Sequence, residues 1–370
     1  MPIPLLLHGR HADAQITYRP FHDWIVPWRF CSFEDEYHSL RTGAGLIDYS
    51  THALIQVRGE DRATFLHSLL TNDVLRLTPG TGCRAALLNA SAKLLADLLV
   101  FTEPDCLWLL CPLTRVDLVV QTLERHHFSE RVEFTNHERR FAVIAMQGPR
   151  TFEVLARLFG QAISLHHLGD HVIAALDDLS VRLIHYSLIN DSGALCLIDS
   201  EQVSTIWEFL RHRREHFGLE LVGWEAFNTA RIEAGVPLWG IDMDESNLLS
   251  ETGLEATTVS ESKGCYLGQE IVARLQTYGS ISQKLVGLTI TGEQVPGQGA
   301  TIMRDADCVG RITSACYSPT LRRPIAMGYV KRSAYEVGTR VEILTGEHRL
   351  PAQVTARPFL PTSSPNASTD

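Results

Sequence analysis

The residues best suited to chemistry lie in one short segment, residues 263–274, which reads Lys-Gly-Cys-Tyr-Leu-Gly-Gln-Glu-Ile-Val-Ala-Arg. The thiol of Cys265 stands between two glycines, a residue type that marks backbone that turns tightly or approaches another group closely. The apolar Ile-Val pair after Gly-Gln-Glu predicts a loop that enters a helix. A thiol near a helix N-terminus and near basic groups such as Lys263 and Arg274 ionises more readily and becomes reactive. The alternative is a small cysteine buried in a turn.

A second group of candidates consists of charged residues at positions where a charge is costly. Asp97 interrupts an otherwise apolar strand, and a buried carboxylate usually has a partner or a function. Arg231 and Glu233 lie two residues apart near a helix end that Gly235 marks. The alternatives are an outward-facing strand residue for Asp97 and a surface salt bridge for Arg231, which would stabilise the fold little.

The composition is that of an ordinary soluble globular protein, with 45% hydrophobic and 21% charged residues, and a chain of 370 residues predicts two or three domains. The net charge of −10 argues against broad binding to nucleic acid or to anionic membranes. No apolar run is long enough to span a membrane, and the apolar N-terminal segment is too short for a signal peptide. The eight scattered cysteines and the adjacent histidine pairs predict neither a disulfide framework nor a metal site, so we expect a reducing cytoplasm.

The chain then divides into elements that must position these residues. After an irregular, aromatic-rich N-terminal arm at 1–45, strand and helix patterns alternate twice, which predicts α+β subdomains at 46–140 and 141–282, the second of which includes the motif. Short strands separated by Gly and Pro turns predict a small antiparallel barrel at 283–360. The Ser/Pro/Asn-rich tail at 361–370 is expected to be disordered.

Several segments together resemble the YgfZ-type folate-binding proteins, which belong to the superfamily of the glycine-cleavage T protein, an aminomethyltransferase. The 263–270 segment resembles the signature of that type, and further landmarks follow in the family's order, at residues 65–74, 146–149, 231–238, 318–320 and 326–330. The resemblance implies a three-domain, cloverleaf-like ring, in which two α+β folate-binding subdomains and a small C-terminal antiparallel β-barrel surround a folate pocket. The cysteine in the motif resembles the branch linked to iron–sulfur proteins, because the aminomethyltransferase branch has no cysteine there.

The resemblance also implies roles for the charged residues. Tetrahydrofolate has a pterin whose donor edge suits a carboxylate, and a glutamate tail that suits arginine or lysine. An arginine at the position of Arg231 lies by the folate in the family, and we place Glu233 with it. An aspartate in the strand of Asp97 is implied to act near folate N5 in the aminomethyltransferases, although Ala96 replaces an adjacent acid that is common there.

Two further positions depart from the family pattern. Asp191 stands where the family often has a glutamate that grips the pterin, and Arg84 stands in place of a folate-contacting tyrosine. Arg84 would then pair with the folate tail or merely cap a strand. The predicted folate-binding set is completed by four residues of the motif: Lys263, Tyr266, Gln269 and Arg274. Its two basic members would raise the thiolate fraction of the cysteine, meet the folate glutamates or face solvent.

Three functions are open at this point. The first is a tetrahydrofolate-binding protein that supports iron–sulfur cluster assembly or repair through a redox-sensitive Cys265. One cysteine cannot hold a cluster alone, so transient contact with a cluster, or ligation shared with an iron–sulfur client or assembly protein, stays open. The second is an aminomethyltransferase that takes a one-carbon unit from a lipoylated carrier protein to tetrahydrofolate. The third is a non-catalytic scaffold with a vestigial pocket. The first two depend on a central cavity walled by Arg231 and Asp97, with the thiol on its rim.

Overall fold

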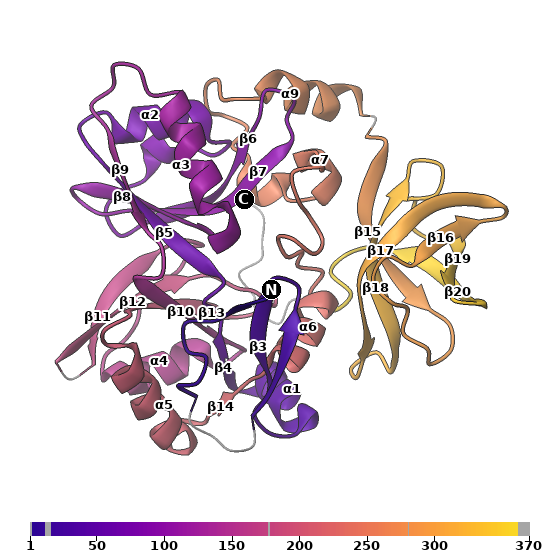
Figure 1. The fold of residues 1–370 in the computed structure, drawn as a ribbon, viewed down its shortest axis with the longest axis horizontal. Helices are drawn as coiled ribbons and strands as arrows, with labels where there is room; N and C mark the ends of the chain where they lie inside the picture. Colours follow the sequence, from indigo (N-terminus) through magenta and orange to yellow (C-terminus); the bar gives the residue numbers. More distant parts are fainter. Residues whose placement is uncertain (1, 12–15, 177, 280, 362–370) are drawn as a thin grey trace. The chain divides into compact units, whose positions relative to one another are not determined.

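The computed structural model describes residues 2–11, 16–176, 178–279 and 281–361 (Figure 1). The chain divides into two compact units, and each is described by itself. The first unit comprises the residues up to Asn89, then Leu95–Phe227 and Thr257–Leu267. The second unit comprises Ala90–Leu94, Asn228–Ala256 and the described residues from Gly268 onward.

A five-stranded sheet forms one half of the first unit. Its strands run in the order β6-β7-β8-β5-β9, with bounds β5 His52–Arg58, β6 Gly82–Leu88, β7 Leu94–Thr102, β8 Cys106–Pro112 and β9 Glu133–His137. Alternate residues of these strands bury an apolar core with the helices α2 (Arg62–Leu69) and α3 (Val116–Arg125). The residues between these core positions point to the opposite face of the sheet.

A six-stranded sheet forms the other half of the first unit, in the order β11-β12-β13-β10-β4-β14. Its bounds are β4 Ala44–Asp48, β10 Phe141–Gln147, β11 His171–Leu176, β12 Leu179–His185, β13 Gly193–Asp199 and β14 Leu219–Leu221. The helices α4 (Thr151–Phe159) and α5 (Val203–Phe217) bury their apolar faces in its core. β4 pairs with β10 and so joins this sheet, although the sequence grouped residues 46–48 with the preceding subdomain. All five residues of β4 are buried, as expected for a strand covered on both faces.

The described residues of the N-terminal arm form strands and a helix, so the prediction that the arm is irregular was wrong for them. It forms a three-stranded sheet of β1 (Ile3–Pro4), β3 (Trp24–Arg29) and β2 (Thr17–Phe21), followed by α1 (Phe33–Thr42). The hydroxyl of Ser32 accepts a hydrogen bond from the Asp35 amide at 3.1 Å and caps α1. The aromatic residues in this arm obscured the short strand signals.

The remaining helices include the one that the motif predicts. α9 (Gln269–Tyr278) begins directly after Gly268, whose φ of +83° is the left-handed conformation that glycine adopts easily. The other three are α6 (Trp224–Glu233), α7 (Leu249–Thr252) and α8 (Glu255–Thr258). Among the described residues, no helix is both long and apolar enough to cross a membrane.

The predicted C-terminal barrel is confirmed, and it is a closed six-stranded antiparallel barrel in the order β15-β18-β17-β16-β19-β20 (Figure 1, orange to yellow). Its strands are β15 Gln283–Ile290, β16 Thr301–Arg304, β17 Asp307–Ser318, β18 Arg323–Lys331, β19 Arg340–Thr345 and β20 His348–Thr355. Alternate side chains such as Leu288, Ile312 and Ile343 fill its interior. Of the tail predicted to be disordered, residues 362–370 lie outside the described residues. The mixed α+β class is confirmed, whereas the domain boundaries and the ring remain predictions.

Candidate functional site

The face of the five-stranded sheet opposite its helix-covered core carries a largely buried polar cluster. Because Ala85 and Ala96 point into the core, strand alternation places Arg84 of β6 and Asp97 of β7 on the opposite face. His52 of β5 lies on that face too, since the next residue, Ala53, belongs to the core. Three neighbouring segments of the first unit thus bring titratable groups to one surface.

Arg84 and Asp97 form a two-pronged ion pair at the centre of this cluster. The Arg84 Nε donates to Asp97 Oδ1 at 2.9 Å, and Nη2 donates to Oδ2 at 2.5 Å. The two side chains are only 11% and 14% exposed, respectively. Burial alone would lower the pKa of Arg84, but the charge of Asp97 and its hydrogen bonds outweigh burial and raise it. Arg84 and Asp97 were each predicted as site residues, and the structure shows that they are partners of one another.

Three aromatic residues, Tyr49, His52 and Tyr186, lie near this pair, and the sequence predicted none of them as a site residue. The ring of Tyr49 stacks on His52 with centroids 4.7 Å apart, and the hydroxyl of Thr51 lies 3.0 Å from His52 Nδ1. Burial lowers the pKa of His52 to about 4 against the opposing charge of Asp97, so the imidazole is neutral at pH 7. Burial also raises the pKa of Tyr186, which senses the charges of both Arg84 and Asp97. The alternation of apolar core residues in 52–58 could have indicated that His52 lies on the same face of the sheet as Arg84 and Asp97.

Asp191 lies in the loop between β12 and β13. Its Oδ1 accepts a hydrogen bond from the Ser192 amide at 2.6 Å, and its own amide donates to the Ser187 hydroxyl at 3.0 Å. The preceding Asn190 has a φ of +56°, which this short polar residue type tolerates. The carboxylate is half-buried, so it shapes the loop and still reaches solvent.

Lys263, the first residue of the motif, points into the protein. Its ammonium donates to the backbone oxygen of His67 at 2.5 Å, to that of Leu70, and to that of Asn72 at 3.3 Å. It also lies 5.1 Å from the centre of the Tyr266 ring. Burial lowers the pKa of Lys263 to about 8, although the nearby Asp73 opposes this shift. The roles predicted for Lys263 and Tyr266 toward folate stay predictions.

Cys265 is exposed, whereas Lys263 and Tyr266 on either side are buried. All eight cysteines of the chain are free thiols. The remaining motif residues belong to the second unit: Gln269 is half-buried, and Glu270 and Arg274 are exposed on α9. Their predicted gathering around the thiol therefore stays a prediction.

Arg231 forms a buried ion pair inside the second unit. Its guanidinium pairs with Asp242 and donates to Asn228 Oδ1 at 2.9 Å, Val236 O at 3.2 Å and the Ser314 hydroxyl at 2.6 Å. The Arg231 and Asp242 side chains are 1% and 0% exposed. This network joins the end of α6 to β17 of the barrel, and Asp242 was missed because it lies in an irregular segment. The contact of Arg231 with folate stays a prediction.

Glu233 is also fully buried, and it ties the same helix to the end of β17. Its carboxylate accepts a hydrogen bond from the Ser318 hydroxyl, and its backbone oxygen accepts one from the Phe359 amide at 2.9 Å. Ser318 belongs to one of the landmarks singled out in the sequence. The landmarks that contain Glu233 and Ser318 are thus far apart in the sequence but joined by a hydrogen bond within the second unit.

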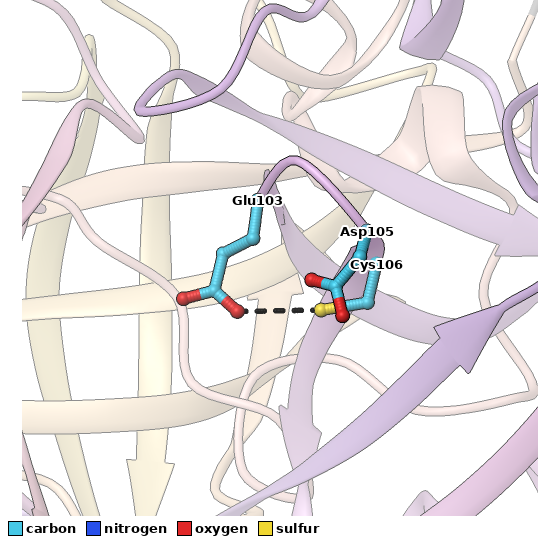
Figure 2. Close-up of side chains that lie close together, drawn as sticks. All are labelled: Glu103, Asp105 and Cys106. Carbon is cyan, nitrogen blue, oxygen red and sulfur yellow. Dashed lines mark hydrogen bonds between the residues drawn. The ribbon is translucent and has the colours of Figure 1, made fainter.

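A third group, Glu103, Asp105 and Cys106, has the composition of a metal site (Figure 2). The thiol of Cys106 donates to Glu103 Oε2 at 3.3 Å, and the indole of Trp108 donates to the same oxygen at 2.9 Å. Arg182 pairs with the other oxygen of Glu103. Burial raises the pKa of Cys106 to about 12, so in this hydrogen-bonded group its side chain is a neutral thiol that donates to Glu103. The group is a hydrogen-bonded link between the two sheets of the first unit.

Comparison with known families covers nearly the whole chain. The family model "GCVT N-terminal domain" matches residues 7–262, and the model "Glycine cleavage T-protein C-terminal barrel domain" matches residues 283–360. Among solved structures, "glycine cleavage system aminomethyltransferase T" from Bartonella henselae has a TM-score of 0.86 at 24% identity, over 97% of this chain and 98% of that one. At this identity the likeness concerns the fold.

Curated relatives match over a similar length. A protein named aminomethyltransferase from Prochlorococcus marinus is 28% identical over 366 residues, which cover 95% of this chain and 96% of the relative. One of the same name from Caldanaerobacter subterraneus is 27% identical over 343 residues, covering 92% of this chain and 91% of the relative. A third, from Bacillus subtilis, is 26% identical over 343 residues, covering 92% and 94%.

Proposed function

The chain belongs to the glycine cleavage T-protein family, and from this membership we propose that it is an aminomethyltransferase that uses tetrahydrofolate. The observation that carries the proposal is the end-to-end match with relatives of that name, over 92% to 95% of this chain. This function is the second of the three that the sequence leaves open. It fits the comparisons better than the iron–sulfur role does.

The polar cluster around Arg84 and Asp97 on the five-stranded sheet supports the proposal. A pterin is flat and has a hydrogen-bonding edge; the rings of Tyr49 and Tyr186 lie near Arg84, whose partner Asp97 is a carboxylate that suits that edge. Arg84 uses one acceptor position on each oxygen of Asp97, so each oxygen keeps a second lone pair for a folate donor. The residue types of this face therefore fit a reduced folate.

The proposed reaction also needs a group that exchanges protons. In the aminomethyl unit, the bond from carbon to the carrier sulfur and the bond from carbon to the amino nitrogen both break. The carbon forms two bonds to folate nitrogens, and the two protons displaced there end on the sulfur and on the departing ammonia. We assign this exchange to Asp97, with Arg84 as the residue that orients it.

The test is a calorimetric titration with tetrahydrofolate and with folic acid, followed by an assay of methylene-tetrahydrofolate formed from an aminomethylated lipoyl carrier. Tetrahydrofolate should bind more tightly than folic acid, and Asp97→Asn should lower turnover by about 10²- to 10⁴-fold. Asp105→Asn, which removes an exposed acid near the same sheet, is the matched control and should leave turnover unchanged. Binding of tetrahydrofolate without turnover by the wild-type protein would contradict the transferase.

A second candidate, the iron–sulfur role, is favoured by one specific observation. The Cys265 thiol is exposed on a loop whose neighbouring side chains are buried, and the sequence resemblance associates this cysteine with proteins that support iron–sulfur enzymes. On this proposal, Cys265→Ala binds tetrahydrofolate normally but does not restore iron–sulfur enzymes in cells that lack the protein. Cys308→Ala, at an exposed thiol of the barrel, is the control. Full restoration by Cys265→Ala would eliminate this candidate, and absence of any folate binding would leave only the scaffold.

A further inference from the structure

The motif at residues 263–270 has a structural feature that neither candidate function uses. Lys263 is the most buried charged residue of the motif, with 8% of its surface exposed. Its ammonium has three N–H donors, and three backbone oxygens accept from it, those of His67, Leu70 and Asn72. The donor capacity of the side chain is therefore fully used inside the protein.

The accepting oxygens lie at the C-terminal end of α2 and directly after it. Carbonyls at this end of a helix lack intrahelical partners, and the helix dipole favours a positive charge there. Lys263 supplies both the donors and the charge, although it is far away in the sequence. It thus acts as a C-terminal cap for α2 that comes from another part of the chain.

Two further hydrogen bonds join the same two segments. The hydroxyl of Thr71 donates to the backbone oxygen of Thr258 at 2.5 Å, and the Ser260 amide donates to the backbone oxygen of Thr71 at 3.1 Å. Residues 258–263 are therefore attached to residues 67–72 along their length, and Lys263 is the last attachment before the thiol. Cys265 follows two residues later and is exposed.

The residue type at this position is selective. The chain contains four lysines and 29 arginines, so a basic residue is usually an arginine here. A compact ammonium can direct three donors to oxygens grouped around one end of a helix, whereas the planar guanidinium directs its donors outward in a fixed fork. Lysine is thus the residue that fits these oxygens.

We propose that Lys263 is a positioning residue, whose bonds to the carbonyls after α2 hold the loop that presents the Cys265 thiol to solvent. The part of the proposal that concerns activity depends on the second candidate function, in which this thiol acts. The part that concerns the loop stands by itself. The two parts are tested separately.

The loop is tested first in the wild-type protein by acetylating its amines and following each lysine by mass spectrometry. The other three lysines, Lys93, Lys284 and Lys331, are exposed. Although its lowered pKa favours the reactive free amine, Lys263 is only 8% exposed and its three donors are all bonded, so it should be acetylated at least about ten-fold more slowly than these three. Equal reaction rates at all four lysines would overturn the proposal.

The loop is tested next by amide hydrogen exchange in Lys263→Met, with Lys284→Met as the matched control. Loss of the three bonds should raise exchange in residues 260–267 about ten-fold or more and leave the barrel unchanged. Lys263→Arg keeps the charge but not the geometry, and it should also raise exchange. Unchanged exchange in Lys263→Met would contradict the proposal, and if that variant fails to fold, Lys263→Arg and the acetylation rates decide.

The activity is tested by restoring iron–sulfur enzymes in cells with Lys263→Met, Cys265→Ala and the double variant. If Lys263 acts through the thiol, the double variant should be no worse than the more defective single variant, because effects in one pathway do not add. Additive losses would mean that Lys263 acts independently of Cys265. Full activity of Cys265→Ala would instead refute the candidate function, without touching the loop measurements.

Discussion

At the scale of single residues, the ion pair of Arg84 and Asp97 is the best-defined polar feature of the first unit. A buried ion pair gains little over an apolar pair of the same size, but the removal of one partner leaves the other charge without compensation. The two residues lie on neighbouring strands, and both oxygens of the carboxylate are used. Removal of one partner of this pair should therefore lower the free energy of unfolding more than removal of one partner of an exposed ion pair elsewhere in the chain.

Replacement of Arg84 tests this difference. Arg84→Met should lower the free energy of unfolding by about 3 kcal/mol, because Asp97 stays in a mostly buried site without its partner. The control is Arg349→Met, which breaks the exposed pair with Glu342 and should cost about 0–1 kcal/mol. Chemical denaturation measures both, and equal effects would show that Asp97 is solvated well enough to need no partner.

The sequence indicated both members of this pair but not their pairing. Asp97 was conspicuous because it is polar within an apolar strand, and Arg84 because it departs from a family pattern. That they meet depends on the register between β6 and β7, which is set by the whole sheet. Arg231 was likewise expected at a ligand, and its partner Asp242 lies in a segment without periodicity, so no local pattern could reveal it.

At the scale of elements, local sequence periodicity predicted helices and strands whose formation depends mainly on neighbouring residues. The helix that begins after Gly268 and the antiparallel barrel at the C-terminal end follow from apolar positions and turn residues. The partner of β4 could not be predicted, because β10 lies about a hundred residues further along and strand pairing is not local. The helix before β4 was missed because aromatic residues dominate the segment in front of it.

The turn after β5 offers a test at this scale. Gly59 has a φ of +109°, and a Cβ there would lie 1.9 Å from the backbone oxygen of Arg131. Gly292 has a similar φ of +97°, but a Cβ there has no described neighbour within 4 Å. Gly292→Ala should thus cost only the conformational strain, about 1–2 kcal/mol.

Gly59→Ala should cost clearly more than its control, because the backbone of residues 131–132 must also move away from β5. Urea unfolding of the two variants beside the wild-type protein measures the difference. A loss of stability no larger than that of Gly292→Ala would mean that the turn relaxes freely. In that case the close approach to Arg131 would not be what requires glycine.

At the scale of the whole molecule, buried imidazoles such as those of His52 and His171 couple stability to pH. Burial lowers the pKa of His52 to about 4 and likewise that of His171 to about 4, whereas both would titrate near 6.5 in the unfolded chain. Between pH 6.5 and 4 the unfolded chain binds more protons than the folded one. The stability from these groups is therefore present above pH 6.5 and is lost as the pH falls toward 4.

Unfolding free energies measured from pH 7.5 to pH 4 should accordingly decrease on acidification. His171→Gln removes one of the two groups and should make the decrease shallower over the same window. Carboxylates contribute to the slope as well, so the comparison is between variant and wild type and not with zero. An identical slope in both proteins would mean that His171 titrates in the folded protein as it does in the unfolded chain, and so contributes nothing to the pH dependence.

Strand edges differ between the closed barrel and the six-stranded sheet, and this difference predicts where two molecules would associate through their backbones. Each barrel strand has a partner on both sides, so its backbone offers no unpaired row of amides and carbonyls to another molecule. β11 is different: it terminates the six-stranded sheet, and its Val172 and Ile173 are 37% and 56% exposed. Heating or crowding should therefore start aggregation at this apolar border strand, and a lysine introduced there would suppress it without disturbing either candidate site.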